Sequence, residues 1–216
     1  LALEDGTVFT GTASGADGEV DGEVCFNTSM TGYQEVLTDP SYAGQIVTMT
    51  YPLIGNTGVN PADLESARPV VRGFVVRELA EVASNYRSTQ PLGDWLADHG
   101  VVGVTGIDTR ALTRRLRTTG SLKGVISTDP SKADAELVDA AKRSAGVVGQ
   151  NLVAEASVAE PLAWSEDLGD WRPVQGEVAR SGERLRVAAL DCGAKRNIFR
   201  NLVDAGCDVT VLPWDA

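Results

Sequence analysis

The chain has 216 residues, a formal net charge of −11 and a hydrophobic share of 43%. That share is ordinary for a globular protein and excludes a disordered chain. The negative charge argues against nucleic acid or an anionic membrane as the main partner, and no apolar run approaches the roughly 20 residues that a membrane span needs. We therefore expect no nucleic acid and no membrane among the partners.

Short strands and turns alternate in the first part of the chain. Apolar and β-branched runs predict strands at residues 1–3, 7–10, 24–26, 46–49, 70–78, 101–105 and 122–127. Proline or Asp108 at the start and glycine after the end predict helices at residues 91–99, 108–118 and 132–144. This mixture indicates an α/β domain with more than one layer.

The predicted helix at residues 108–118 carries several arginines on one side. Arg110, Arg114 and Arg117 recur at i, i+4 and i+7 and therefore share a face. This face could receive acidic residues of a partner, although a charge cluster is usually only a solvated face. The sequence leaves both interpretations open.

A change of pattern marks the last third of the chain. Residues 155–183 are acidic, rich in turn-forming residues and contain Trp164 and Trp171, which predicts a linker lying over a surface. Residues 185–190 and 209–212 are then predicted as buried strands on either side of a helix at 197–205. Because two parallel strands and one helix cannot cover both faces of their sheet, we expect the chain to stop inside a domain.

Three cysteines, Cys25, Cys192 and Cys207, lack the spacing of a metal site. Cys25 and Cys207 have apolar, strand-like surroundings, where a buried and unreactive thiol is expected. Glu4 and Asp5 interrupt the apolar start, which argues against a secretory signal. Reduced thiols in a chain without a secretory signal predict a cytoplasmic location. The spacing of the cysteines predicts no metal site.

The segment from Gly22 to Pro52 is the most informative part of the chain, because small polar side chains crowd between two predicted strands. These side chains are Asn27, Thr28, Ser29, Thr31, Tyr33, Gln34, Thr38, Asp39, Ser41 and Tyr42. Gly32, Pro40 and Gly44 are placed to form turns. Such groups suit hydrogen bonds to one another, to a partner surface or to a small polar ligand.

This segment, GEVCFNTSMTGYQEVLTDPSYAGQIVTMTYP, closely resembles the N-terminal domain of the small subunit of carbamoyl-phosphate synthase. Five further blocks resemble the same family in the same order: LALEDGTVFTG, YPLIGNTGVN, GFVVRELAEVASNYR, GIDTRALTRRLRTTGSLKGVI and DCGAKRNIFRNLVDAGCDVTVLP. Only residues 147–185 match weakly. Several ordered motifs are more specific than one short pattern, so the chain is identified as a member of this family.

The resemblance implies a fold and a domain organisation. Residues 1–150 are expected to form a three-layer β/β/α swivelling domain, and residues 151–184 an interdomain linker. Residues 185–216 are expected to be the truncated start of a flavodoxin-like class I glutamine amidotransferase domain. The overall class is α/β.

The resemblance also implies a function. The family's small subunit hydrolyses L-glutamine to glutamate and ammonia, which passes to the large subunit for ATP-dependent synthesis of carbamoyl phosphate from bicarbonate. The implied partners are the large subunit, in a heterodimer and in higher-order assemblies of heterodimers, and L-glutamine. ATP and Mg²⁺ are implied on the large subunit, with no cofactor in this chain. The sequence does not separate arginine biosynthesis from pyrimidine biosynthesis.

The groups that hydrolyse glutamine are not recognisable here. The reaction needs a thiolate, an imidazole and an orienting carboxylate, and the family's nucleophile lies in a G-x-C-x-G motif that this chain lacks. Cys192 follows a predicted strand as an elbow nucleophile would, but its context, LDCGA, lacks the first glycine. The one histidine, His99, ends a predicted helix, where interaction with the helix dipole is expected. We expect no catalytic residue and no glutamine hydrolysis by this chain alone.

Three residues are implied to act in binding or ammonia transfer. Ser41, in TDPSY, matches the serine through which the family's N-terminal domain reaches glutamine in the neighbouring domain. A plainer interpretation is that Ser41 only caps the turn after Pro40. Asp39 and Lys195 are implied to line the ammonia route or an interface. Lys195 also begins a predicted helix, where a cation is unfavourable, and a solvated turn would explain it equally well.

Two alternatives come from other classes of protein. The chain could be a non-catalytic docking module that binds the large subunit, sharing the fold but lacking glutaminase chemistry. It could also be a freestanding α/β ligand-binding domain, which would make the ordered motifs accidental.

Overall fold

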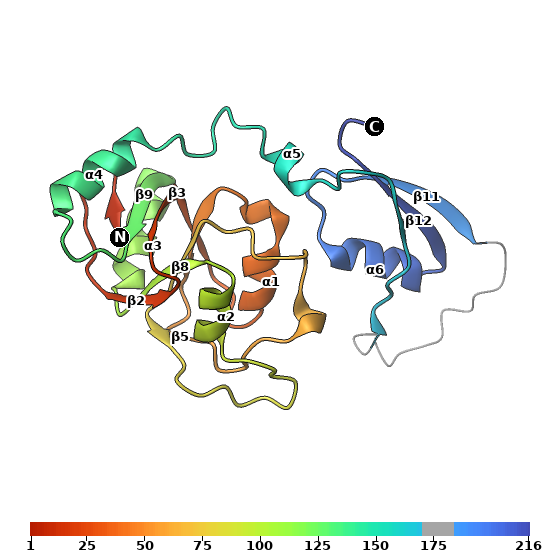
Figure 1. Ribbon diagram of the computed structural model, residues 1–216, viewed down its shortest axis with the longest axis horizontal. Coiled ribbons are helices and arrows are strands. Elements are labelled where there is room, and N and C mark those ends of the chain that lie inside the picture. Colours follow the sequence, from red (N-terminus) through yellow and green to blue (C-terminus); the bar gives the residue numbers. More distant parts are fainter. Residues whose placement is uncertain (170–183) are drawn as a thin grey trace. The chain divides into compact units, whose positions relative to one another are not determined.

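A computed structural model describes residues 1–169 and 184–216, and its contacts divide the chain into two units, Leu1–Gln150 and Asn151–Ala216 (Figure 1). Each unit has its own sheet and its own apolar core. Within the described residues, no helix is long and apolar enough to cross a bilayer.

Residues 1–150, all of which are described, form a seven-stranded sheet in the order β1-β9-β3-β4-β6-β8-β2. The strands are β1 Ala2–Leu3, β2 Thr12–Gly15, β3 Glu19–Asn27, β4 Gln45–Met49, β6 Gly73–Val75, β8 Val102–Thr105 and β9 Leu122–Ser127. The four central strands, β3, β4, β6 and β8, run parallel, and the strands at both ends pair antiparallel. A separate parallel pair consists of β5 Leu53–Ile54 and β7 Glu78–Leu79.

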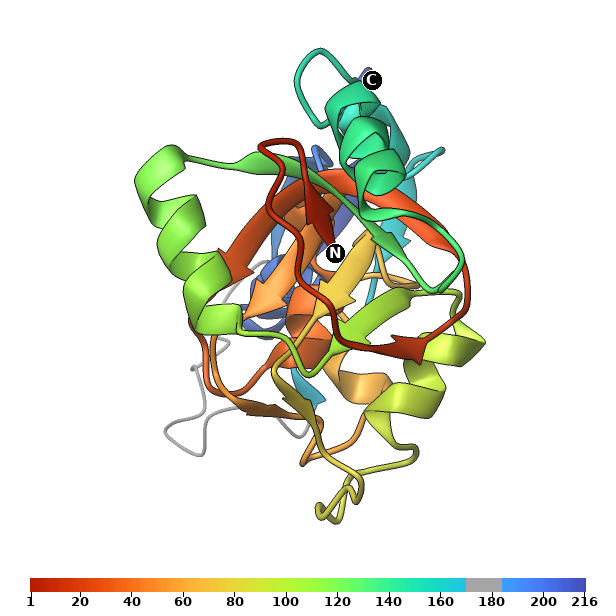
Figure 2. The ribbon, with the colours of Figure 1, turned by 90° about the vertical axis from the view of Figure 1, so that its left-hand side faces the viewer.

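Helices cover both faces of the large sheet. Neighbouring strand residues point to opposite sides, and apolar side chains on both sides pack against helices. Val47 and Phe74 pack with α1 (Tyr33–Thr38) and α2 (Leu92–Asp98) on one face. Their neighbours Ile46 and Val75 pack with α3 (Thr109–Thr119) on the other. The fourth helix, α4 (Asp134–Arg143), covers β1 and β9 on the face opposite α3 (Figure 2). The predicted α/β class is confirmed.

The second unit contains the predicted strand–helix–strand arrangement. β11 (Leu185–Leu190) and β12 (Cys207–Leu212) are parallel and are joined by α6 (Arg196–Asp204). Phe199 of α6 packs on Val209 and Val211 of β12, so α6 covers one face of the sheet. The prediction of a parallel unit here is confirmed, but the prediction that residues 185–190 are buried is wrong: Leu185 is 71% exposed and Leu190 is 54% exposed, because α6 covers only one face of the sheet.

The segment expected as a linker, residues 151–184, contains regular structure in its described part. It includes α5 (Leu152–Ala156) and β10 (Leu162–Trp164), and β10 pairs antiparallel with β12. The Trp164 ring lies 5.1 Å from the Phe199 ring, measured between centroids. Trp164 thus belongs to the core of the second unit, while Trp171 lies outside the described residues.

Two predictions of secondary structure in the first unit were wrong or incomplete, and other elements were not predicted. The run at 70–78 is two strands, β6 and β7, which belong to different sheets. Residues 7–10 contribute only one isolated bridge, between Val8 and Ala2. The short helix α1 and the edge strand β2 were not predicted from the sequence.

Candidate functional site

The segment after β3 folds into α1 and a single turn of 3₁₀ helix, Pro40–Tyr42. Gly32 precedes α1 with φ of 78°, a left-handed conformation that glycine adopts without strain. Asp39 separates the two helices, and its Oδ1 accepts a hydrogen bond from the Ser41 backbone N at 3.0 Å. The sequence therefore places Asp39 and Ser41 side by side in one turn.

Asp39 and Ser41 differ in exposure. Asp39 is buried, with 6% of its surface exposed, whereas Ser41 is exposed. The cap of the turn is the Asp39 carboxylate and not the Ser41 hydroxyl. Within the described residues, no hydrogen bond involves the Ser41 Oγ, so this hydroxyl is presented to solvent on a turn held by its neighbour.

Hydrogen bonds across the fold hold α1 in place. Gln34 Nε2 donates to the Asn60 carbonyl at 2.6 Å, and Asn60 N donates to Gln34 Oε1 at 2.9 Å. The Tyr33 hydroxyl donates to the Gly58 carbonyl at 2.6 Å. Because Gln34 and Tyr33 are buried, these bonds are shielded from water. They hold α1 in place immediately before the Ser41 turn in the chain.

The buried Thr38 connects the end of α1 to residues 65–66. Its Oγ1 donates to the Gln34 carbonyl at 2.9 Å and accepts from Glu65 N at 2.9 Å. Ser66 Oγ donates to the Thr38 carbonyl at 2.6 Å. Many polar side chains of this segment therefore form hydrogen bonds with one another and with the backbone. This is one of the three roles that the sequence allows, beside binding a partner surface or a small polar ligand.

An acidic group lies beside α1. Burial raises the pKa of Glu35, and the negative charges of Asp63 and Glu65 raise it further. Arg87 Nη2 forms an ion pair with Asp63 Oδ1 at 3.1 Å. Sequence patterns could not reveal this acidic group, because its members are separated by up to 30 positions and meet only in the fold.

Lys195 lies in the second unit as the exposed N-cap residue of α6, and its side chain does not cap the helix. The preceding turn is organised by the buried Asp191, whose Oδ1 accepts from Gly193 N at 3.0 Å and from Ala194 N at 2.9 Å. The structure brings Asp39 and Ser41 together, and places Lys195 on a separate, equally well-organised turn.

Neither Cys192 nor His99 lies in a catalytic arrangement with other described side chains of its own unit. Cys192 is exposed in the turn after β11. His99 is the C-cap of α2, where its Nδ1 lies 2.8 Å from the Trp95 carbonyl oxygen and its ring packs 4.5 Å from the Trp95 ring. Among the described residues, no group of three or more His, Cys, Asp or Glu side chains is arranged to hold a metal ion.

A surface hollow of about 370 Å³ lies at α4, and none of its lining residues belongs to the Ser41 turn. Its walls carry both signs of charge, from Glu19, Lys132, Glu136, Asp139 and Arg143. Lys132 Nζ and Glu19 Oε2 already pair at 2.6 Å. Because carboxylates and cations share these walls, the hollow lacks the single sign of charge that would select a charged ligand.

Comparison with known proteins decides the family. The domain model described as carbamoyl-phosphate synthase small chain, CPSase domain, matches residues 1–126, which include the Asp39–Ser41 turn. The chain belongs to the carbamoyl-phosphate synthase small chain family. The resemblance inferred from the ordered motifs is thereby confirmed.

Curated relatives cover the second unit as well. The carbamoyl phosphate synthase small chain of Syntrophotalea carbinolica is 55% identical over 217 residues, which cover 99% of this chain and 56% of the relative. The small chain of Rhodopirellula baltica is 51% identical, with 100% and 57% covered, and that of Aquifex aeolicus is 50% identical, with 99% and 57% covered. The chain therefore spans about half the length of the curated relatives it matches.

Proposed function

We propose that this chain is part of the small, glutamine-hydrolysing subunit of carbamoyl-phosphate synthase. In this role it serves the hydrolysis of L-glutamine to glutamate and ammonia, and the ammonia passes to a large subunit for ATP-dependent synthesis of carbamoyl phosphate. Membership of the family supports this role. The proposed setting is cytoplasmic, in a heterodimer, with ATP and Mg²⁺ on the large subunit and no cofactor in this chain.

The observation that carries the proposal is the turn at Asp39 and Ser41. A hydroxyl can donate to a carboxylate or accept from an ammonium or amide group, and all these groups occur in L-glutamine. The buried Asp39 carboxylate holds the Ser41 backbone N, which leaves the exposed Ser41 hydroxyl for a ligand. We assign Ser41 to glutamine binding, and Asp39 and Lys195 to the ammonia route or its interface.

The proposed domains are the N-terminal domain at 1–150, the linker region at 151–184 and the start of the amidotransferase domain at 185–216. The thiolate and imidazole of the reaction are proposed to lie outside these 216 residues, because the chain carries no G-x-C-x-G motif and its histidine is bonded to Trp95. The chain by itself is accordingly proposed to be inactive.

The test uses the complete small subunit with its large subunit. Ser41→Ala should lower kcat/KM for glutamine several-fold, since one neutral hydrogen bond is worth about 0.5–1.5 kcal/mol. Synthesis from free ammonia should stay near the wild-type rate because ammonia bypasses the glutaminase site. Ser29→Ala is the matched control, since Ser29 is also exposed in this segment but is not assigned to the ligand.

Equal losses with glutamine and ammonia would make Ser41 a folding or interface residue and refute its assignment to the ligand. The same assay separates the alternative role of a non-catalytic docking module, which the absent nucleophile motif favours. A docking module would support synthesis from ammonia only, whatever residue occupies position 41.

A further inference from the structure

Thr38, the last residue of α1, is completely buried, with 0% of its surface exposed. It lies three positions before Ser41 in the chain. A buried hydroxyl needs hydrogen-bond partners within the protein, because leaving it without them costs free energy. The partners of Thr38 therefore show what its hydroxyl holds together.

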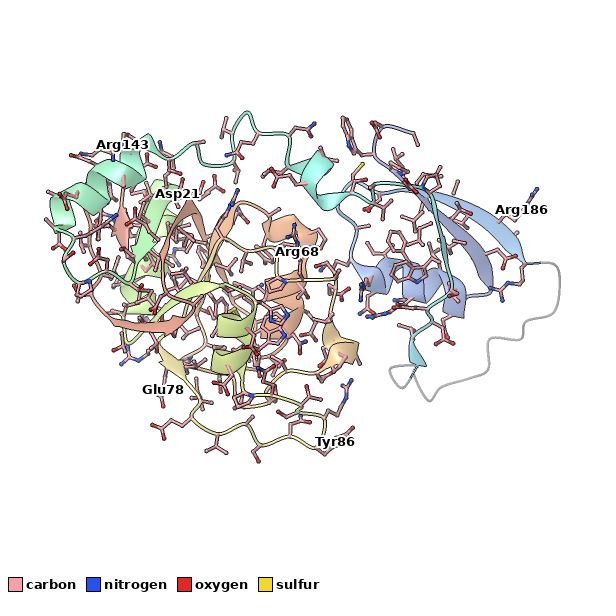
Figure 3. All side chains as sticks on the ribbon, in the orientation of Figure 1. Asp21, Arg68, Glu78, Tyr86, Arg143 and Arg186 are labelled. Carbon is pink, nitrogen blue, oxygen red and sulfur yellow. The ribbon has the colours of Figure 1, made fainter. Side chains whose placement is uncertain are left out.

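The hydrogen bonds of Thr38 tie the end of α1 to a later segment of the chain. Its Oγ1 donates to the Gln34 carbonyl and accepts from Glu65 N, both at 2.9 Å. Its carbonyl accepts from Ser66 Oγ at 2.6 Å, and Ser66 Oγ also lies 2.7 Å from the Arg68 carbonyl oxygen. Figure 3 shows Arg68 beside α1, where these bonds place it. The residue that begins the turn is thereby fixed to groups 27 and 28 positions later in the chain.

The residues after Ser41 are held by different contacts. The Tyr42 hydroxyl accepts from Asn27 Nδ2 at 2.9 Å, and Gln45 begins β4. Ser41 thus lies between two anchors, with Thr38 before it and Tyr42 and β4 after it.

The Ser41 hydroxyl depends on these anchors for its position. In the part of the chain that the structure describes, its Oγ forms no hydrogen bond, so its place is set by the backbone that carries it. Hydrogen bonds weaken steeply when their distance or angle departs from the optimum. A small shift of the turn would therefore weaken a bond from Ser41 to a ligand, even with Ser41 itself unchanged.

We propose that Thr38 is a positioning residue for the binding of L-glutamine. Its buried hydroxyl does not touch the ligand, but it holds the turn so that the Ser41 hydroxyl meets the ligand in hydrogen-bonding geometry. This inference rests on the proposed function, which makes Ser41 a ligand-binding residue. The hydrogen bonds of Thr38 supply the connection.

The experiment measures steady-state kinetics of the complete small subunit with its large subunit, using glutamine or free ammonia. Thr38→Val keeps the shape of the side chain but removes the hydroxyl, which takes the acceptor from Glu65 N. We expect kcat/KM for glutamine to fall several-fold, mainly through a higher KM, because a binding contact is weakened. Synthesis from ammonia should stay near the wild-type rate. Thr38→Ser keeps both donor and acceptor and should restore most of the use of glutamine.

Thr48→Val is the matched control for the loss of a buried hydroxyl. Thr48 is also 0% exposed, but its Oγ1 has no hydrogen-bond partner among the described residues. The same chemical change at this position should leave synthesis from both nitrogen sources near the wild-type rate. Asp108→Ala is a control for general destabilisation, because it removes the cap of α3 and should not alter KM for glutamine.

A double-mutant cycle tests whether Thr38 acts through Ser41. In a Ser41→Ala background, Thr38→Val should cause no further loss with glutamine, because the hydroxyl that it positions is gone. Ser66→Ala removes the bond to the Thr38 carbonyl and should cause a smaller loss of the same kind. It decides the matter where Thr38→Val yields no folded complex.

Equal losses with glutamine and ammonia would overturn this inference, and so would normal use of glutamine by Thr38→Val. A Thr38→Val effect that adds in full to that of Ser41→Ala would also overturn it. All three results leave the assignment of Ser41 intact. The absence of a glutamine-specific loss in Ser41→Ala would instead refute the proposed role of Ser41, and the role of Thr38 with it.

Discussion

Glu35 lies on α1 beside two other carboxylates, and its protonation is linked to stability. Burial raises its folded pKa above the ordinary value of 4.5, and Asp63 and Glu65 add to the effect. Below pH 4.5 both folded and unfolded chains hold the proton, so there is no penalty. As the pH rises, the unfolded chain releases its proton first, and the folded state loses stability until the pH exceeds the folded pKa.

Glu35→Gln should therefore raise the free energy of unfolding at pH 7 and change it little near pH 4. Urea unfolding at both pH values measures the difference. Glu81→Gln is the control, because it removes an exposed carboxylate from the same unit and should have little effect at either pH. Destabilisation by Glu35→Gln at pH 7 would show that the carboxylate makes a favourable contact that outweighs its burial.

At the scale of elements, α3 illustrates how local signals and packing act together. Asp108 Oδ1 accepts from Ala111 N at 2.9 Å and caps the helix, which ends before Gly120 with φ of 91°. Leu112 and Leu116, fully or almost fully buried, attach α3 to its face of the large sheet. Arg110 is exposed in the first turn of α3, where its positive charge interacts unfavourably with the helix dipole. The Asp108 cap offsets this effect.

Loss of the cap on α3 should be measurable. Asp108→Ala should lower the free energy of unfolding by about 1 kcal/mol, because Ala111 N loses its side-chain acceptor. Asp108→Asn retains an acceptor oxygen and should cost much less. Chemical unfolding of the two variants gives the comparison, and equal destabilisation by alanine and asparagine would show that the negative charge, and not the hydrogen bond, is what matters.

At the scale of the whole molecule, the first unit has its own core and a sheet closed within residues 1–150. The second unit is different, because its sheet is covered by α6 on one face while Leu190 on β11 is 54% exposed. We therefore expect the two units to differ in independent stability.

A fragment of residues 1–150 should fold alone and unfold cooperatively in urea. A fragment of residues 1–121 should not, since it removes β9, which lies between β1 and β3 and pairs with both. Circular dichroism and urea unfolding distinguish the outcomes. A broad, non-cooperative transition for the longer fragment would show that the first unit depends on residues after 150.

Elements with strong local signals could be predicted from the sequence. The Asp108 cap, the glycine after α3 and the strand–helix–strand pattern after residue 184 all specify structure through neighbours within a few positions. By contrast, α1 was missed although Tyr33, Val36 and Leu37 recur at helical spacing, because its six residues follow a run of polar groups typical of a loop. β10 was missed because its partner, β12, lies more than 40 residues later.

The same division applies to the candidate site. The sequence by itself determined the family, the α/β class and the neighbourhood of Asp39 and Ser41, because ordered motifs and a Pro-containing turn act over short distances along the chain. Only the tertiary structure decided that Gln34 is hydrogen-bonded to Asn60 and that Glu35 meets Asp63 and Glu65. Those contacts form between residues that packing brings together, and side-chain burial and its effect on a pKa exist only after the chain has folded.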